Sequence, residues 1–188
     1  ATVPVPVNDG PAVNNVVRQT FTVTVDAIND APTLNALNNL TLAENAAQQS
    51  LSLTGVGTGA ANETQTLTVT ATSSNPSLIP NPTVNYTSPN TSGSLIFTPV
   101  VNANGTATIT VTVNDGQAIN NTATRTFAVN VSAVNQRPTL AAISDVTINE
   151  DASGQTVSLT GVGTGATNES QTLSITAVSS NPSLIPNP

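Results

Sequence analysis

The side chains that could do chemistry in this 188-residue chain are mostly hydroxyls and amides, with a few carboxylates. Histidine, cysteine and lysine are absent, so a serine or threonine nucleophile would lack its usual base. The lack of cysteine also excludes disulfides and thiolate metal sites. Glu150 and Asp151 are sequence neighbours, whereas glycoside hydrolysis needs two acids that face each other across a cleft. We therefore predict that the chain is not an enzyme.

A glycine run, Gly55-Val-Gly57-Thr-Gly59, resembles a phosphate-binding loop. Such a loop leads from a strand into a helix whose N-terminus meets the phosphate. Here the run is followed by QTLTVTAT, whose alternation of apolar and polar residues is typical of another strand. We interpret the run as a tight turn and expect no nucleotide site.

The charge of the chain excludes two classes of partner. Its formal net charge is −7, and its only basic side chains are Arg18, Arg125 and Arg137. Nucleic acids and anionic membranes are bound mainly through Lys and Arg, so we expect neither as a partner. No apolar run approaches the length that spans a bilayer, and we expect no membrane-spanning segment.

A repeat of 106 residues organises the chain: residues 31–82 recur without a gap as residues 137–188. Between residues 1–82 and 107–188, about 50 of the 82 positions are identical. A period near 100 is typical of whole domains in a row. We predict that residues 1–30 are the C-terminal strands of one repeat, 31–136 a complete repeat, and 137–188 the N-terminal part of the next. We expect the chain to be a window on a longer tandem array.

Seven segments of the complete repeat alternate apolar and polar residues with the period of two that half-buried strands show. The predicted strands are residues 40–43, 50–54, 65–72, 83–86, 94–98, 106–114 and 124–133. In the last of these, Phe127, Val129 and Val131 share one face. The prediction is an all-β fold of tandem seven-stranded sandwiches. They would stack end to end, because an odd number of antiparallel strands places the two termini of a domain at opposite ends.

The segments VTVNDG and NNTATRTFAVNVSAVN, with DAINDAPTL in the equivalent place upstream, resemble the closing strands and linker of cadherin-like and bacterial Ig-like repeats. Asp26, Asn29, Asp30 and Pro32 fit the linker of that family, and Glu44 resembles its early glutamate. The resemblance implies an immunoglobulin/cadherin-like β-sandwich from a large secreted protein of the bacterial surface. The implied function is an extracellular rod or filament, as an adhesin stalk or a fibre building block. Its partners would be neighbouring repeats or identical subunits. The alternative is a module that binds a carbohydrate or host ligand through its end loops.

The same resemblance implies a calcium (Ca²⁺) site at the first joint between repeats. Cadherin joints hold calcium through carboxylates of the linker and of the next domain's loops, and the ion takes about six to eight oxygen ligands. The residues that correspond are Asp26, Asn29, Asp30, Glu63 and Asp115. Gly55 and Gly57 stand where cadherins have paired aspartates, and at the second joint Ser132 and Gln136 replace two of the linker acids. The alternative is that the Asn and Asp side chains simply form turns by bonding nearby backbone amides.

Overall fold

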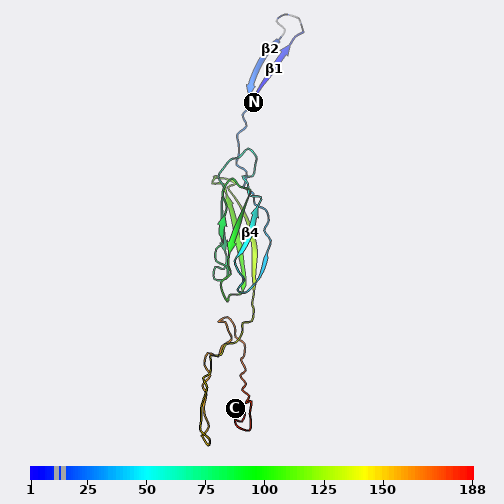
Figure 1. Ribbon diagram of the computed structural model, residues 1–188. Helices are drawn as coiled ribbons and strands as arrows, with labels where there is room; N and C mark the ends of the chain where they lie inside the picture. Colours follow the sequence, from blue (N-terminus) through cyan, green and yellow to red (C-terminus); the bar gives the residue numbers. More distant parts are fainter. Residues whose placement is uncertain (11–12, 14–15) are drawn as a thin grey trace.

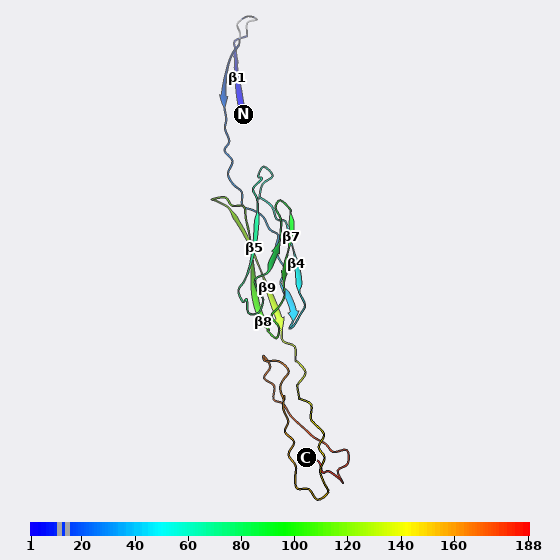
Figure 2. The ribbon, with the colours of Figure 1, turned by 60° about the vertical axis from the view of Figure 1, so that its left-hand side comes forward.

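The computed structural model describes residues 1–10, 13 and 16–188, and these contain strands, turns and irregular segments but no helix. The strands are β1 (Thr2–Asn8), β2 (Val16–Thr22), β3 (Leu40–Ala43), β4 (Gln49–Thr54), β5 (Thr68–Ser73), β6 (Thr83–Asn85), β7 (Ser92–Phe97), β8 (Gly105–Asn114) and β9 (Thr122–Ser132). Figures 1 and 2 show three parts in a row: the β1–β2 hairpin, a sandwich that holds the other strands, and an irregular C-terminal part. Across the part of the chain that is described, no helix is long and apolar enough to cross a membrane.

The central sandwich consists of a four-stranded sheet of order β3-β9-β8-β5 and a three-stranded sheet of order β4-β7-β6. All pairs are antiparallel except β3 and β9, which run parallel. The seven strands predicted for the complete repeat are therefore all present, and the all-β immunoglobulin-like sandwich is confirmed. The largest difference in bounds is at β5, which begins at Thr68 rather than at residue 65.

The hydrophobic core lies between the two sheets and is closed at its ends by loop residues. On β9, Phe127, Val129 and Val131 are buried while the residues between them face outward or lie half-buried, which confirms the predicted face. Five further core residues lie outside the strands: Leu34, Val56, Leu67, Leu78 and Ile79. The core is thus larger than the strand pattern alone predicts.

The N-terminal hairpin has the same strand register as β8 and β9 of the sandwich. Thr2 lies opposite Thr22, just as Thr108 lies opposite Ala128 at the equivalent positions of the repeat. The hairpin stands apart from the sandwich in Figure 1, and its apolar residues are exposed.

Residues 137–188 carry the same sequence pattern as the first half of the sandwich but form only an isolated bridge, between Thr139 and Gly163. In the sandwich, β3 pairs with β9 and β4 pairs with β7. Both partner strands lie in the second half of the repeat. Alternating segments alone are not enough to make strands, because a strand needs a neighbour for its backbone hydrogen bonds.

Candidate functional site: the joints between repeats

Two joints connect the repeats, and the same pair of hydrogen bonds occurs at both. At the first joint the Asn29 side-chain oxygen accepts from Gln65 Nε2 at 2.9 Å, and the backbone N–H of Asp30 donates to Glu63 Oε1 at 2.8 Å. At the second joint Gln171 Nε2 donates to Asn135 Oδ1 at 2.8 Å, and the Gln136 N–H donates to Glu169. The partners at the second joint are those of the first, 106 positions later. The contact between the linker and the following repeat therefore recurs with the period of the sequence repeat.

The glycine run packs against the segment by which the linker enters the sandwich. Thr33 and Gly57 form an isolated antiparallel bridge, in which the Thr33 N–H donates to the Gly57 carbonyl at 2.8 Å. Gly59 has φ of +103°, and a Cβ atom there would lie 2.4 Å from the backbone oxygen of Ala31. Only glycine allows both this conformation and this close approach. The run is a turn that seats the linker, and β5 follows it rather than a helix.

At the first joint the loop between β8 and β9 holds the linker from the other side. Asp115 is only 3% exposed, and its Oδ2 atom accepts a hydrogen bond from Asn29 Nδ2 at 2.9 Å. Its Oδ1 atom accepts from the backbone N–H of Gln117 at 2.9 Å, which shapes the loop. Asn120 Nδ2 donates to the Asn29 carbonyl at 3.0 Å. Asn29 is therefore fixed through both its side chain and its backbone.

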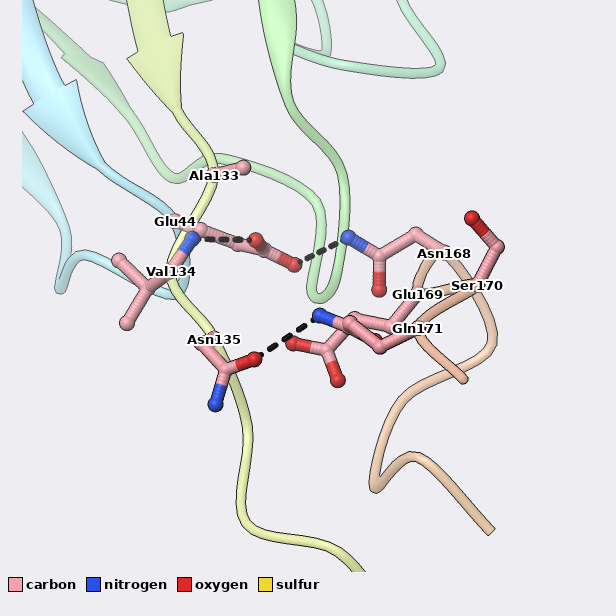
Figure 3. A pocket seen from close by; sticks show the side chains of 8 residues that line it. All are labelled: Glu44, Ala133, Val134, Asn135, Asn168, Glu169, Ser170 and Gln171. Atoms are coloured by element: carbon pink, nitrogen blue, oxygen red, sulfur yellow. Dashed lines mark hydrogen bonds between the residues drawn. The ribbon is translucent and has the colours of Figure 1, made fainter. Parts of the chain in front are cut away.

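At the second joint the central sandwich itself contacts the following repeat through Glu44 (Figure 3). Glu44 follows β3 directly and is only 5% exposed. Its Oε2 atom accepts from the backbone N–H of Val134 at 3.0 Å, and its Oε1 atom accepts from Asn168 Nδ2 at 2.8 Å. Asn168 also lies 3.4 Å from Asn104 Oδ1. One buried carboxylate thus binds both the linker and the next repeat.

The structure brings four of the five predicted calcium ligands together at the first joint, but as partners in hydrogen bonds. Glu63 and Asp115 use three of their four oxygens to accept N–H groups, and Asn29 turns its amide nitrogen toward Asp115. Asp26 is exposed and takes no part in these bonds. The fourth oxygen, Glu63 Oε2, is buried without a hydrogen-bond partner.

In this arrangement the side chains of Asn29, Glu63 and Asp115 are held by hydrogen bonds with N–H groups. Calcium takes about six to eight oxygen ligands, and four side-chain oxygens of the predicted set, from Asn29, Glu63 and Asp115, already accept N–H groups. Within residues 1–10, 13 and 16–188 there is no group of three or more acidic, His or Cys side chains that could hold a metal. The calcium site therefore rests on the family resemblance, and it stays a prediction.

Comparison with known protein families decides what kind of domain these joints connect. The family described as bacterial Ig domain matches residues 29–130, which is more than half of the chain. The chain belongs to the bacterial Ig domain family. The match begins at Asn29, the linker residue of the first joint, and ends inside β9 of the same sandwich. The predicted resemblance to bacterial Ig-like repeats is confirmed.

Solved structures similar to this bacterial Ig protein include domains 4 and 5 of the S-layer protein SbsC, with 18% identity and a TM-score of 0.40. That match covers 70% of this chain and 57% of the other. Another is the pair of titin domains z1z2 in complex with telethonin, with 16% identity and a TM-score of 0.41. It covers 62% of this chain and 55% of the titin chain. The chain thus spans less than two thirds of either. No match to a curated protein was found.

Residue types alone do not reveal three of the side chains that build the joints of this bacterial Ig protein. Gln65, Asn120 and Asn168 are amides without an expected charge or metal role, yet each holds a linker or a neighbouring repeat. One signal could have found two of them: Asn-Glu-x-Gln occurs at residues 62–65 and again at 168–171.

Proposed function

We propose that this chain is a structural part of an extracellular bacterial surface protein, in which Ig domains follow one another as a rod or filament. The observation that carries the proposal is the repeated joint, with the same Asn–Gln and N–H–Glu hydrogen bonds at two places 106 residues apart. A protein that recognises one ligand needs one special site. A spacer needs each domain to connect to the next in the same way.

The buried carboxylates also favour a structural role over catalysis. Glu44 and Asp115 are the two buried acidic residues of the described chain, and each accepts two hydrogen bonds from N–H groups. A general acid or base needs to exchange a proton with a substrate in an accessible cleft. These carboxylates hold the backbone and amide groups of the joints instead, which suits a protein that bears load along its length.

Immunogold labelling of intact bacterial cells with an antibody to the central sandwich tests the surface assignment. We expect gold particles along projections outside the cell envelope of unpermeabilised cells. Label that appears only after permeabilisation would overturn the proposal. Label confined to the tips of projections would overturn the spacer role and favour the alternative of a ligand-binding module, for which binding to an array of glycans is the next measurement.

Thermal unfolding with and without calcium separates the hydrogen-bonded joint from a calcium-bound one. An ion present at 100 times its dissociation constant would stabilise the folded state by about 2.7 kcal/mol. For a domain of this size that corresponds to a rise in Tm of about 10–20 °C. Because hydrogen bonds already occupy the joint, we expect the Tm in millimolar calcium to equal the Tm in chelator. A saturable rise that is lost in the Asp115→Asn variant would contradict this expectation and establish the calcium site.

A further inference from the structure

Glu44 lies where one repeat ends and the next begins, and it is one of the residues through which the two make direct contact. The residues that it joins are far apart in sequence: Val134 is 90 positions away and Asn168 is 124 positions away. Val134 belongs to the linker, whereas Asn168 belongs to a loop of the following repeat. In Figure 3 the carboxylate of Glu44 lies between the two and points one oxygen toward each.

The two joints show complementary halves of a single interface. The second joint has the complete sandwich before it and so includes Glu44, while the first has the complete sandwich after it and so includes Asp115. Both include the linker Asn and the Gln that holds it. The residues that differ between the two joints come from opposite sides of the linker. Because the repeats are equivalent, we expect a joint between two complete repeats to contain both sets of residues.

Each repeat carries both halves of this interface. The counterpart of Asn168 on the central repeat is Asn62, which is exposed at its linker end. The counterpart of Glu44 on the following repeat is Glu150, which is also exposed. A contact between two different patches of the same unit is heterologous, and heterologous contacts that do not close into a ring generate open filaments.

We propose that Glu44 is a latch that orients one repeat on the next, and that the partner it fits is the Asn168-type loop of another copy of the repeat. The proposal rests on the repeat array proposed above and specifies how its joints are held. The carboxylate suits this place because it is an acceptor at both oxygens and meets two N–H donors. An amide in its place would turn an N–H group toward another N–H group. The latch needs no cation.

Distances between two spin labels on the full chain measure how firmly the latch holds. The chain has no cysteine, so cysteines introduced at the exposed residues Thr126 and Ser158 are the only labelling sites. One lies on β9 of the sandwich and the other in the following repeat. We expect one narrow distance distribution in the parent protein and a distribution at least twice as wide in Glu44→Gln. The widths should be the same in calcium and in chelator.

Three variants make this test specific. Glu150→Gln is the matched control, because it makes the same change at the same place of the repeat on an exposed side chain, and its distribution should equal the parent's. Asn168→Ala removes the bond from the other side, outside the sandwich, and should widen the distribution as Glu44→Gln does. The double variant should be no wider than either single variant, because both remove the same bond.

The outcomes distinguish the latch from other roles of Glu44. Unchanged widths in Glu44→Gln and Asn168→Ala would overturn the latch, and widening that occurs only in calcium would assign Glu44 to a cation site instead. If Glu44→Gln unfolds the sandwich, which the fluorescence of Tyr86 reports, Asn168→Ala decides the matter alone. Failure of the latch leaves the surface assignment standing, because immunogold labelling does not depend on joint stiffness.

Discussion

Replacing Phe127 with alanine is expected to lower the free energy of unfolding of the central sandwich by about 3–5 kcal/mol. Phe127 lies on β9, is 2% exposed, and faces the opposite sheet as the largest fully buried side chain of the core. Its removal loses the transfer free energy of the ring and leaves a cavity that rigid sheets cannot close. Urea unfolding followed by Tyr86 fluorescence measures the change, since Tyr86 is the only tyrosine, the chain has no tryptophan, and its ring packs against this core.

The repeat provides a matched control for this prediction. Phe21 occupies the equivalent position in the N-terminal hairpin and is 54% exposed, so Phe21→Ala should change the stability of the sandwich by less than about 0.5 kcal/mol. Equal losses in the free energy of unfolding for the two substitutions would mean that Phe21 is buried in the hairpin as Phe127 is on β9. A cost below about 1 kcal/mol at Phe127 would show that the face of β9 assigned to the core is wrong.

Replacing Leu78 with alanine is expected to destabilise the same sandwich by about 2–5 kcal/mol. Leu78 is 2% exposed although it lies in the loop between β5 and β6. Its N–H donates to the Asn75 carbonyl at 3.1 Å, and its carbonyl accepts from the Val100 N–H at 2.9 Å. The loop is therefore held on both sides while the side chain closes one end of the core. Urea unfolding with the same fluorescence signal gives the size of the loss.

Leu184 is the control for Leu78, because the SNPSLIPNP sequence around both is identical. Leu184 is 74% exposed, and Leu184→Ala should leave the unfolding of the sandwich unchanged. The turn itself does not need the core, since Leu184 N–H still donates to the Asn181 carbonyl at 3.0 Å. The pair thus separates local turn formation from burial. A neutral Leu78→Ala would refute the role of this loop in closing the core.

The strands of the sandwich were predictable because their alternation is local. The bounds of β3 match the predicted ones, and β8 begins one residue before them at Gly105. The loop contribution to the core was not predictable in this way. Leu78 and Ile79 are adjacent, lie between two prolines and show no alternation, so their burial depends on how the turn folds back onto the sheets.

The joints were predictable in place, whereas the calcium chemistry that the family resemblance implies there stays a prediction. The linker residues Asn29 and Asp30 and the loop residues Glu63 and Asp115 do meet, as the family resemblance implies. Whether a carboxylate binds a cation or an N–H group depends on the donors around it, and those donors come from distant parts of the chain. Glu44 illustrates this, because one of its partners lies 124 positions away.

The irregular C-terminal part shows the limit of reasoning from a repeat. Residues 155–160 carry the alternation of β4, yet Leu159 is exposed where its counterpart Leu53 is fully buried. β4 is a strand because β7 lies beside it. Sequence pattern thus gives the capacity to form a strand, and the neighbouring strand decides whether it forms.

The most direct test of the central claim is electron microscopy of the protein purified from the bacterial surface, imaged in the presence of a calcium chelator. The account predicts extended rods with one bead for each repeat of 106 residues and a narrow spread of angles between neighbouring beads. Compact particles would contradict the proposed tandem array. Beads that are flexibly strung in chelator and straight only in calcium would contradict joints held by the hydrogen bonds of Asn29, Glu44 and Asp115.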